Sequence, residues 1–488
     1  MRNQQSDMDL DSTATESVAT ESTMETFPPS VSATLQPALT PRYNCVGLSV
    51  DLEETQVCAT LQATELDDND DSRRAPVDIV IALDVSGSMN GTKLDLCKET
   101  LKLLLRQLNE KDRFGLVTFA SDVQVDIETA KMTKKTKDEA LSKIMQLTTR
   151  GCTNLSGGIS LAAREIREVT NPNEVRTIFL LTDGHANEGV TSDQGISQLV
   201  NGCLCGVQPP ITLHCFGYGA NHNEDLLLSI SNATQGGTYY FVENDSSVRT
   251  AFGDALGGVL SVVAQNVVLK IFVPDEAKLS GVSITKVHHD KAVAQADGSF
   301  VVSLGDFYSE ESRDVLVTVK LAADAIQVPH LKMSVSYADT INKTLVMSQE
   351  EECFIARPSN SDVSEANEHV EVQWLRVHAV EQMEAAKKES GEGQLPQARG
   401  RIASTLSSLM KGGRSHHPLV QQMAADLETV HTGLSSTSTY RAYGAKNLNA
   451  TYQSHGMQRC AEADSSKTNA YRSSKKKKMT SAFKKDNN

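Results

Sequence analysis

The stretch Asp84-Val85-Ser86-Gly87-Ser88 follows an almost wholly apolar run, Val77-Asp78-Ile79-Val80-Ile81-Ala82-Leu83. The run is rich in β-branched residues and has the length of one buried strand in a parallel sheet. Polar residues begin where the strand should end, Gly87 lets the chain turn, and a helical pattern starts near Thr92. Open α/β sheets bind their ligands at the carboxyl ends of central strands. The sequence therefore predicts a binding site at Asp84–Ser88.

Strand and helix patterns alternate from Asp78 to about Leu260, which predicts a mostly parallel sheet covered by helices on both faces. Strands are expected at residues 78–84, 114–119, 123–127, 177–182, 212–216 and 238–242, and helices at 92–108, 136–147, 155–169, 193–202, 224–231 and 246–259. We expect an α/β, Rossmann-like domain over residues 76–260.

The pattern changes on both sides of this domain. Residues 1–42 are rich in Ser, Thr, Asp and Glu and are expected to be disordered. Residues 43–75 predict two strands of a hairpin, Gly47–Leu52 and Val57–Leu61, that join a β-sandwich formed by residues 261–356. Residues 357–435 predict a helical domain, and residues 436–488 a tail that is basic and disordered at its end.

Three loops of the α/β domain offer oxygen ligands at strand ends or helix starts. They contain Asp84, Ser86 and Ser88 in the first, Thr153 in the second and Asp183 in the third. Hydroxyls and carboxylates without His or Cys suit Mg²⁺ rather than zinc or copper. Two carboxylates and three hydroxyls would leave one octahedral position for a carboxylate from elsewhere. The alternative is that the aspartates are turn residues and the serines cap a helix.

These loops resemble the metal-ion-dependent adhesion site of von Willebrand factor A (vWA) domains, over the segments Asp84–Ser88, Gly151–Asn154 and Thr182–Gly184. The resemblance covers roughly residues 76–260. It implies that the two serines and the threonine contact Mg²⁺ or Mn²⁺ through their hydroxyls, and that the aspartates act directly or through water. It also implies that a Glu or Asp of a protein partner completes the metal's ligand shell.

The flanks resemble a narrower group. The segment Val302–Val317, the helical stretch Trp374–Lys388 and the Tyr440–Tyr443 segment are similar to plant WAVY GROWTH-type proteins. Those proteins are RING-type ubiquitin ligases whose RING precedes the vWA domain. Residues 1–44 contain no cysteine, so the resemblance implies the shared architecture but not the ligase activity.

Composition narrows the class of protein further. The net charge is −15, which argues against nucleic-acid binding, although the last residues are strongly basic. No apolar stretch is long enough to span a membrane, and the N-terminus does not have the pattern of a signal peptide. Nine cysteines without a Cys-x-x-Cys pair predict reduced thiols. We therefore expect a cytoplasmic protein, with the lysine run 475–478 as a nuclear localisation signal, an anchor for an acidic surface, or a solubilising tail.

The leading hypothesis is a non-enzymatic protein-interaction module that binds an acidic side chain of a partner through the metal. One alternative is a scaffold or substrate receptor that works with ubiquitin machinery and a separate RING protein. A second alternative is hydrolysis by metal-activated water. That alternative lacks a general base apart from His185, which is interpreted either as a rim residue of the metal site or as an ordinary loop residue.

Overall fold

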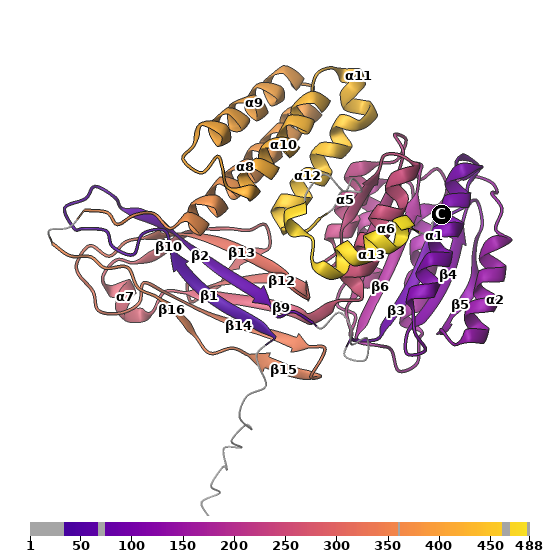
Figure 1. Ribbon diagram of the computed structural model, residues 1–488, viewed down its shortest axis with the longest axis horizontal. Coiled ribbons are helices and arrows are strands. Elements are labelled where there is room, and N and C mark those ends of the chain that lie inside the picture. Colours follow the sequence, from indigo (N-terminus) through magenta and orange to yellow (C-terminus); the bar gives the residue numbers. More distant parts are fainter. Residues whose placement is uncertain (1–33, 67–73, 360–361, 461–468, 486–488) are drawn as a thin grey trace, which may run out of the picture. The chain divides into compact units, whose positions relative to one another are not determined.

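The computed structural model describes residues 34–66, 74–359, 362–460 and 469–485. They form an α/β domain with a mixed, mostly parallel sheet, two further antiparallel sheets and a C-terminal helical region (Figure 1). The predicted fold class is thereby confirmed. Among these described residues, no helix is long and apolar enough to cross a membrane.

The sheet of the α/β domain has the strand order β5-β4-β3-β6-β7-β8. Its strands are β3 (Val77–Asp84), β4 (Arg113–Phe119), β5 (Val123–Lys131), β6 (Val175–Thr182), β7 (Ile211–Tyr218) and β8 (Tyr239–Val242). All neighbours are parallel except β4 and β5. From β3 the chain proceeds to β4 on one side of the sheet and later to β6 on the other. The carboxyl ends of β3 and β6 therefore flank a topological switch point, where such sheets bind ligands.

Helices cover both faces of this sheet. One face carries α1 (Thr92–Gln107), α2 (Lys134–Met145) and α6 (Asp245–Val259), and the other carries α3 (Leu155–Arg167), α4 (Asp193–Leu204) and α5 (Glu224–Asn232). Strand β3 is buried on both sides because Ile79, Ile81 and Leu83 pack into the first layer and Val80 and Ala82 into the second. Its apolar sequence is thus the sequence of a central strand.

Two antiparallel sheets pack over one apolar core and form the sandwich. One contains β1 (Leu35–Pro41), β2 (Glu54–Ala63), β13 (Ser312–Lys320) and β10 (Ser283–His288) in that order. The other contains β11 (Ala292–Ala294), β12 (Phe300–Tyr308), β9 (Val262–Phe272), β14 (Leu331–Asp339) and β15 (Thr344–Met347), with β16 (Glu351–Cys353) also paired to β14. A short helix, α7 (Asp275–Leu279), follows β9.

The expected N-terminal hairpin is corrected in one respect. Strand β2 pairs with β13, but its other neighbour is Leu35–Pro41, a segment predicted to be disordered, rather than Gly47–Leu52. Leu35–Pro41 contains two prolines, which an edge strand tolerates because one row of its backbone groups needs no partner strand. Residues 1–33 lie outside the described residues.

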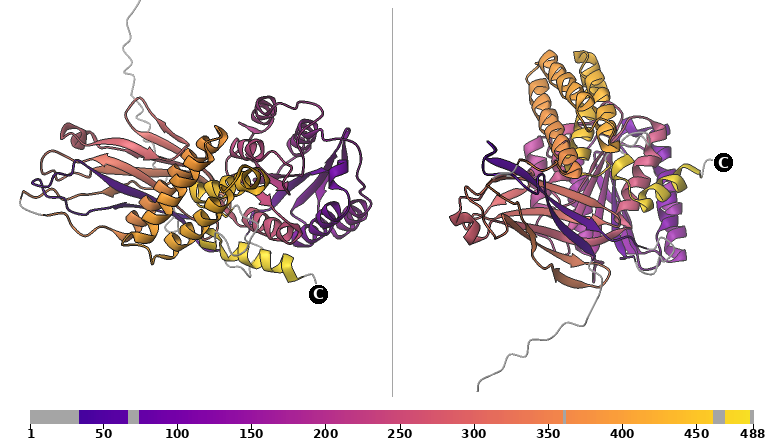
Figure 2. Two further views of the ribbon diagram at one scale, coloured as in Figure 1. Left: turned by 90° about the horizontal axis from the view of Figure 1, so that it is seen from above. Right: turned by 60° about the vertical axis from the view of Figure 1, so that its left-hand side comes forward.

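The helical region begins with α8 (Glu368–Gly391), α9 (Leu395–Lys411) and α10 (Pro418–Gly433), which lie side by side (Figures 1 and 2). After two short turns, Thr437–Thr439 (α11) and Tyr440–Gly444, come α12 (Ala445–Met457) and, beyond the short turn Asn469–Tyr471, α13 (Ser474–Lys485). The predicted disorder at the end of the tail is wrong for α13, which packs against α6.

Buried ion pairs connect the C-terminal tail to the rest of the described chain. Lys476, from the lysine run, is 2% exposed, and its Nζ lies 2.9 Å from Asp254 Oδ2 on α6. Arg459 donates to both oxygens of Glu311, at 2.7 and 3.1 Å, while Arg313 Nη2 lies 3.0 Å from Glu311 Oε1. Although burial opposes it, these two guanidinium groups hold the pKa of Glu311 at about 2.

Candidate metal centre

Asp84 is the last residue of β3, and its carboxylate is buried at the switch point. Oδ1 accepts a hydrogen bond from the backbone N–H of Ser86 at 2.8 Å, and Oδ2 accepts one from the Thr182 hydroxyl at 2.6 Å. Burial raises the pKa of Asp84, and these hydrogen bonds oppose that shift. A nearby cation would favour the ionised carboxylate through Coulomb attraction and so oppose the effect of burial.

The serine hydroxyls stand between the two aspartates. Ser86 Oγ lies 3.1 Å from Ser88 Oγ, and Ser88 Oγ donates to Asp183 Oδ1 at 2.6 Å. Ser86 is 2% exposed, whereas Ser88 is exposed to solvent. In the first turn after β3, the Ser86 hydroxyl is thus buried at the bottom of the site, and the Ser88 hydroxyl lies at its surface.

Backbone hydrogen bonds fix the second loop against the first. The N–H of Gly87 donates to the carbonyl of Gly151 at 3.1 Å, and the N–H of Arg150 donates to the carbonyl of Val85 at 2.7 Å. A Cβ placed on Gly184 would lie 3.7 Å from Thr153 Oγ1 and 3.9 Å from Ser88 Oγ. The hydroxyls of the first two loops therefore meet beside the backbone of the third loop.

Asp183 begins the third loop, directly after β6, and is 1% exposed. Its Oδ2 accepts a short charged hydrogen bond from Lys93 Nζ, which also donates to the Ser88 carbonyl at 3.3 Å. Lys93 lies in the first turn of α1 and was not recognised in the sequence. Only its position, five residues beyond Ser88, could have suggested that its ammonium group reaches the site.

The structure thus brings Asp84, Ser86, Ser88, Thr153 and Asp183 together at one edge of the sheet. All five side chains offer oxygen. Two of them are carboxylates, and the Lys93 ammonium pairs with that of Asp183. This donor set fits a hard divalent cation such as Mg²⁺ or Mn²⁺. A cation bound by Asp183 would take the place of the Lys93 ammonium at that carboxylate.

His185 follows Asp183 by two residues and is exposed. Neither of its ring nitrogens has a hydrogen bond or ion pair to these five residues among the described contacts. His185 therefore lies on the exposed surface of the third loop.

Residues 78–254 match the model of the von Willebrand factor type A domain. This part of the chain is therefore a vWA domain, a class of protein-interaction module that often carries a divalent metal site. The solved structure of a von Willebrand factor type A protein from Catenulispora acidiphila aligns with a TM-score of 0.61 at 17% identity, over 80% of this chain and 89% of that chain. VWA2, an ArnB paralog from Sulfolobus acidocaldarius, aligns with a TM-score of 0.55 at 14% identity, over 87% of this chain and 99% of that chain. Both likenesses show the fold.

The chain is also homologous to plant proteins of the WAVY GROWTH type. It is 27% identical over 320 residues to the E3 ubiquitin-protein ligase WAV3 of Arabidopsis thaliana. The match covers 64% of this chain and 40% of the length of the ligase. The matched region is longer than the vWA domain, so the expected resemblance beyond that domain is confirmed.

Proposed function

We propose that this chain is a protein-interaction module in which the vWA domain binds an acidic side chain of a partner through Mg²⁺ or Mn²⁺. The observation that supports it most is the convergence of five oxygen-bearing side chains at the carboxyl ends of β3 and β6. Ser86, Ser88 and Thr153 would hold the ion through hydroxyls, and the two aspartates would neutralise it directly or through water. The ion supplies a positive centre that attracts a carboxylate.

The surface around the site suits such a contact. The side chains or backbone of Gly87, Ser88, Cys152 and His185 are exposed, while the two aspartates beneath are buried. A partner carboxylate can therefore approach from the side of the loops, whereas the carboxylates of Asp84 and Asp183 are buried at the edge of the sheet. The side chains of the exposed loops would then select among acidic partners, because the metal contact itself reads only a carboxylate.

Affinity purification with the full chain as bait tests this proposal. Wild type in Mg²⁺ should retain a set of partners that is lost in EDTA and lost with Asp84→Ala, because both changes remove the bridging cation. Asp138→Ala is the matched control, since Asp138 is exposed on α2 of the same domain. A partner set that is the same in Mg²⁺, in EDTA and with Asp84→Ala would overturn the proposal.

A second candidate function is a scaffold or substrate-recognition component of a ubiquitin ligase system. The observation that favours it is the homology to a protein named as an E3 ubiquitin-protein ligase, which extends beyond the vWA domain. In this function the vWA site would hold a substrate or a subunit, and another protein would supply the ligase activity.

Quantitative proteomics of the same purifications separates the two candidates. Enrichment of ubiquitin-conjugating enzymes or RING proteins with the wild-type bait would support the scaffold. Metal-dependent partners without any ubiquitin machinery would support the interaction module and contradict the scaffold function.

A further inference from the structure

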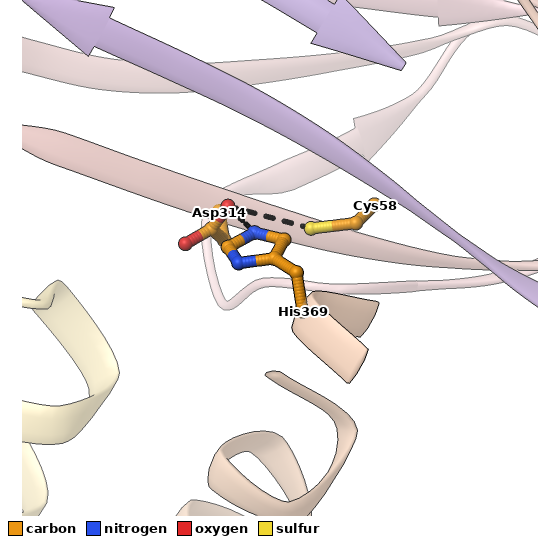
Figure 3. Close-up of side chains that lie close together, drawn as sticks. All are labelled: Cys58, Asp314 and His369. Carbon is orange, nitrogen blue, oxygen red and sulfur yellow. Dashed lines mark hydrogen bonds and ion pairs between the residues drawn. The ribbon is translucent and has the colours of Figure 1, made fainter. Parts of the chain in front are cut away.

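A second cluster of metal-ligating side chains lies outside the vWA domain, where α8 meets the sandwich. It consists of Cys58 on β2, Asp314 on β13 and His369 in the first turn of α8 (Figure 3). One ligand atom from each residue lies within 4.8 Å of the other two. It is the only group of three or more such residues within the described part of the chain.

The strand register explains why these residues meet. Strands β2 and β13 are antiparallel, with Thr60 opposite Asp314 and Cys58 opposite Leu316. Alternate residues of a strand share a face, so all four side chains point to one side of the sheet. That side receives α8, because Cys58 and Leu316 belong to one apolar cluster with Val370. The N-terminal turn of α8 then places the imidazole over Asp314.

The carboxylate, and not the imidazole, is the centre of the cluster. Asp314 Oδ1 lies 2.8 Å from His369 Nε2, accepts from the Thr60 hydroxyl at 2.6 Å and lies 3.4 Å from Cys58 Sγ (Figure 3). A nucleophilic thiol needs a base that takes its proton and an exposed sulfur. Here the thiol is fully buried and donates to a carboxylate, so the arrangement is not that of a cysteine nucleophile.

The geometry points to a Zn²⁺ site, and we propose that Cys58, Asp314 and His369 bind this ion. A thiolate, an imidazole and a carboxylate are the ligand types that zinc takes in proteins, and three protein ligands leave a fourth tetrahedral position for water. The thiolate and the carboxylate together carry the two negative charges that neutralise the ion. Mg²⁺ is excluded by chemistry, because it does not favour sulfur or imidazole ligands.

Asp314 raises the pKa of both neighbouring groups. Burial and the neighbouring Asp314 raise the pKa of the Cys58 thiol well above its usual range. The hydrogen bond to Asp314 raises the pKa of His369. Zinc binding would displace the thiol proton, because a cysteine binds this ion as the thiolate.

The cluster is open on one side. The side chain of His369 is 45% exposed, and a cavity of about 440 Å³ is lined by Asp314 and His369 together with Gln373 and Tyr471. Zinc can reach the site from this cavity, and the fourth ligand would come from the same side. Bound zinc would join the first turn of α8 to both strands, so the site would fasten the helical region to the sandwich. This function is separate from that of the vWA metal site.

Cobalt titration of the full chain tests the proposal with a readout that depends on the sulfur. A thiolate bound to Co²⁺ gives an intense charge-transfer absorption, whereas an all-oxygen vWA site does not. All proteins should carry Asp84→Ala, so that the vWA site does not contribute. This background protein should show the absorption, and stoichiometric Zn²⁺ should abolish it by displacing cobalt.

Two ligand variants, each with a matched control, decide the outcome. Cys58→Ser should remove the absorption, whereas Cys205→Ser, at an exposed cysteine, should leave it unchanged. His369→Gln should weaken Zn²⁺ binding at least about 100-fold, and His378→Gln, on the same helix, should not change it. Because His369 is half-exposed, His369→Gln should fold. This variant therefore tests zinc binding even if Cys58→Ser, at a buried position, does not fold. Absence of the absorption in the background protein, or equal zinc affinity in the two histidine variants, would overturn the proposal.

Discussion

Lys93→Met should increase the affinity of the vWA site for Mn²⁺. The Lys93 ammonium contacts Asp183 Oδ2, and a cation bound by that carboxylate must displace it. A hydrogen bond between charged groups contributes about 1.5–3 kcal/mol. Because the Lys93 side chain is 34% exposed, solvent screening lowers the value to about 1–2 kcal/mol. This corresponds to an affinity increase of about 5- to 30-fold.

The assay is a titration in which electron paramagnetic resonance measures free Mn²⁺ in the presence of the full chain. Lys102→Met is the matched control, because Lys102 lies on the same helix, is 32% exposed and pairs with Glu99 on the surface. The control should bind Mn²⁺ as wild type does. An unchanged or lower affinity of Lys93→Met would refute the reasoning, since it would show that the ammonium does not compete with the cation.

Two further predictions concern the buried charges that hold the tail. Lys476→Met should lower the free energy of unfolding by about 3 kcal/mol, because it removes a positive charge that is paired with the buried Asp254 carboxylate. Limited proteolysis should then cut within α13. Lys477→Met, at an exposed position, should have neither effect. Since the pKa of Glu311 is lowered in the folded chain to about 2, its ion pairs stabilise the fold above the unfolded pKa near 4.5, and this stability is lost as the pH falls toward 2. Urea unfolding should therefore show a fall in stability between pH 5 and pH 3 that Glu311→Gln reduces; an equal fall in both proteins would contradict the assignment.

The sequence predicted the α/β domain well because its signals are local. Every residue of β3 is buried, so an apolar run of strand length was sufficient to place it at the centre of a sheet. The polar residues that follow it had to lie at the carboxyl edge. The carboxyl ends of parallel strands lie at one edge of the sheet, so the sequence alone groups Asp84 with Asp183, while Thr153 joins them from the loop before α3.

The parts that were missed depend on contacts between distant residues. The end of the basic tail is predicted to be disordered, but Met479 and Phe483 lie one helical turn apart and pack into the core beside α6. Cys58 and His369 carry no recognisable motif because they lie far apart in the sequence. The β2–β13 register brings Cys58 to Asp314, and the packing of α8 brings His369. Lys93 was missed because a lysine in the first turn of a helix is ordinarily solvent-exposed.

The central claim is that Asp84, Ser86, Ser88, Thr153 and Asp183 hold a divalent cation. The most direct test is the Mn²⁺ titration of wild type against Asp84→Ala, with Asp138→Ala as the control. The account predicts one Mn²⁺ bound per wild-type chain, competition by Mg²⁺, and loss of binding with Asp84→Ala alone. Equal Mn²⁺ binding by wild type and Asp84→Ala, or no binding by either, would contradict it.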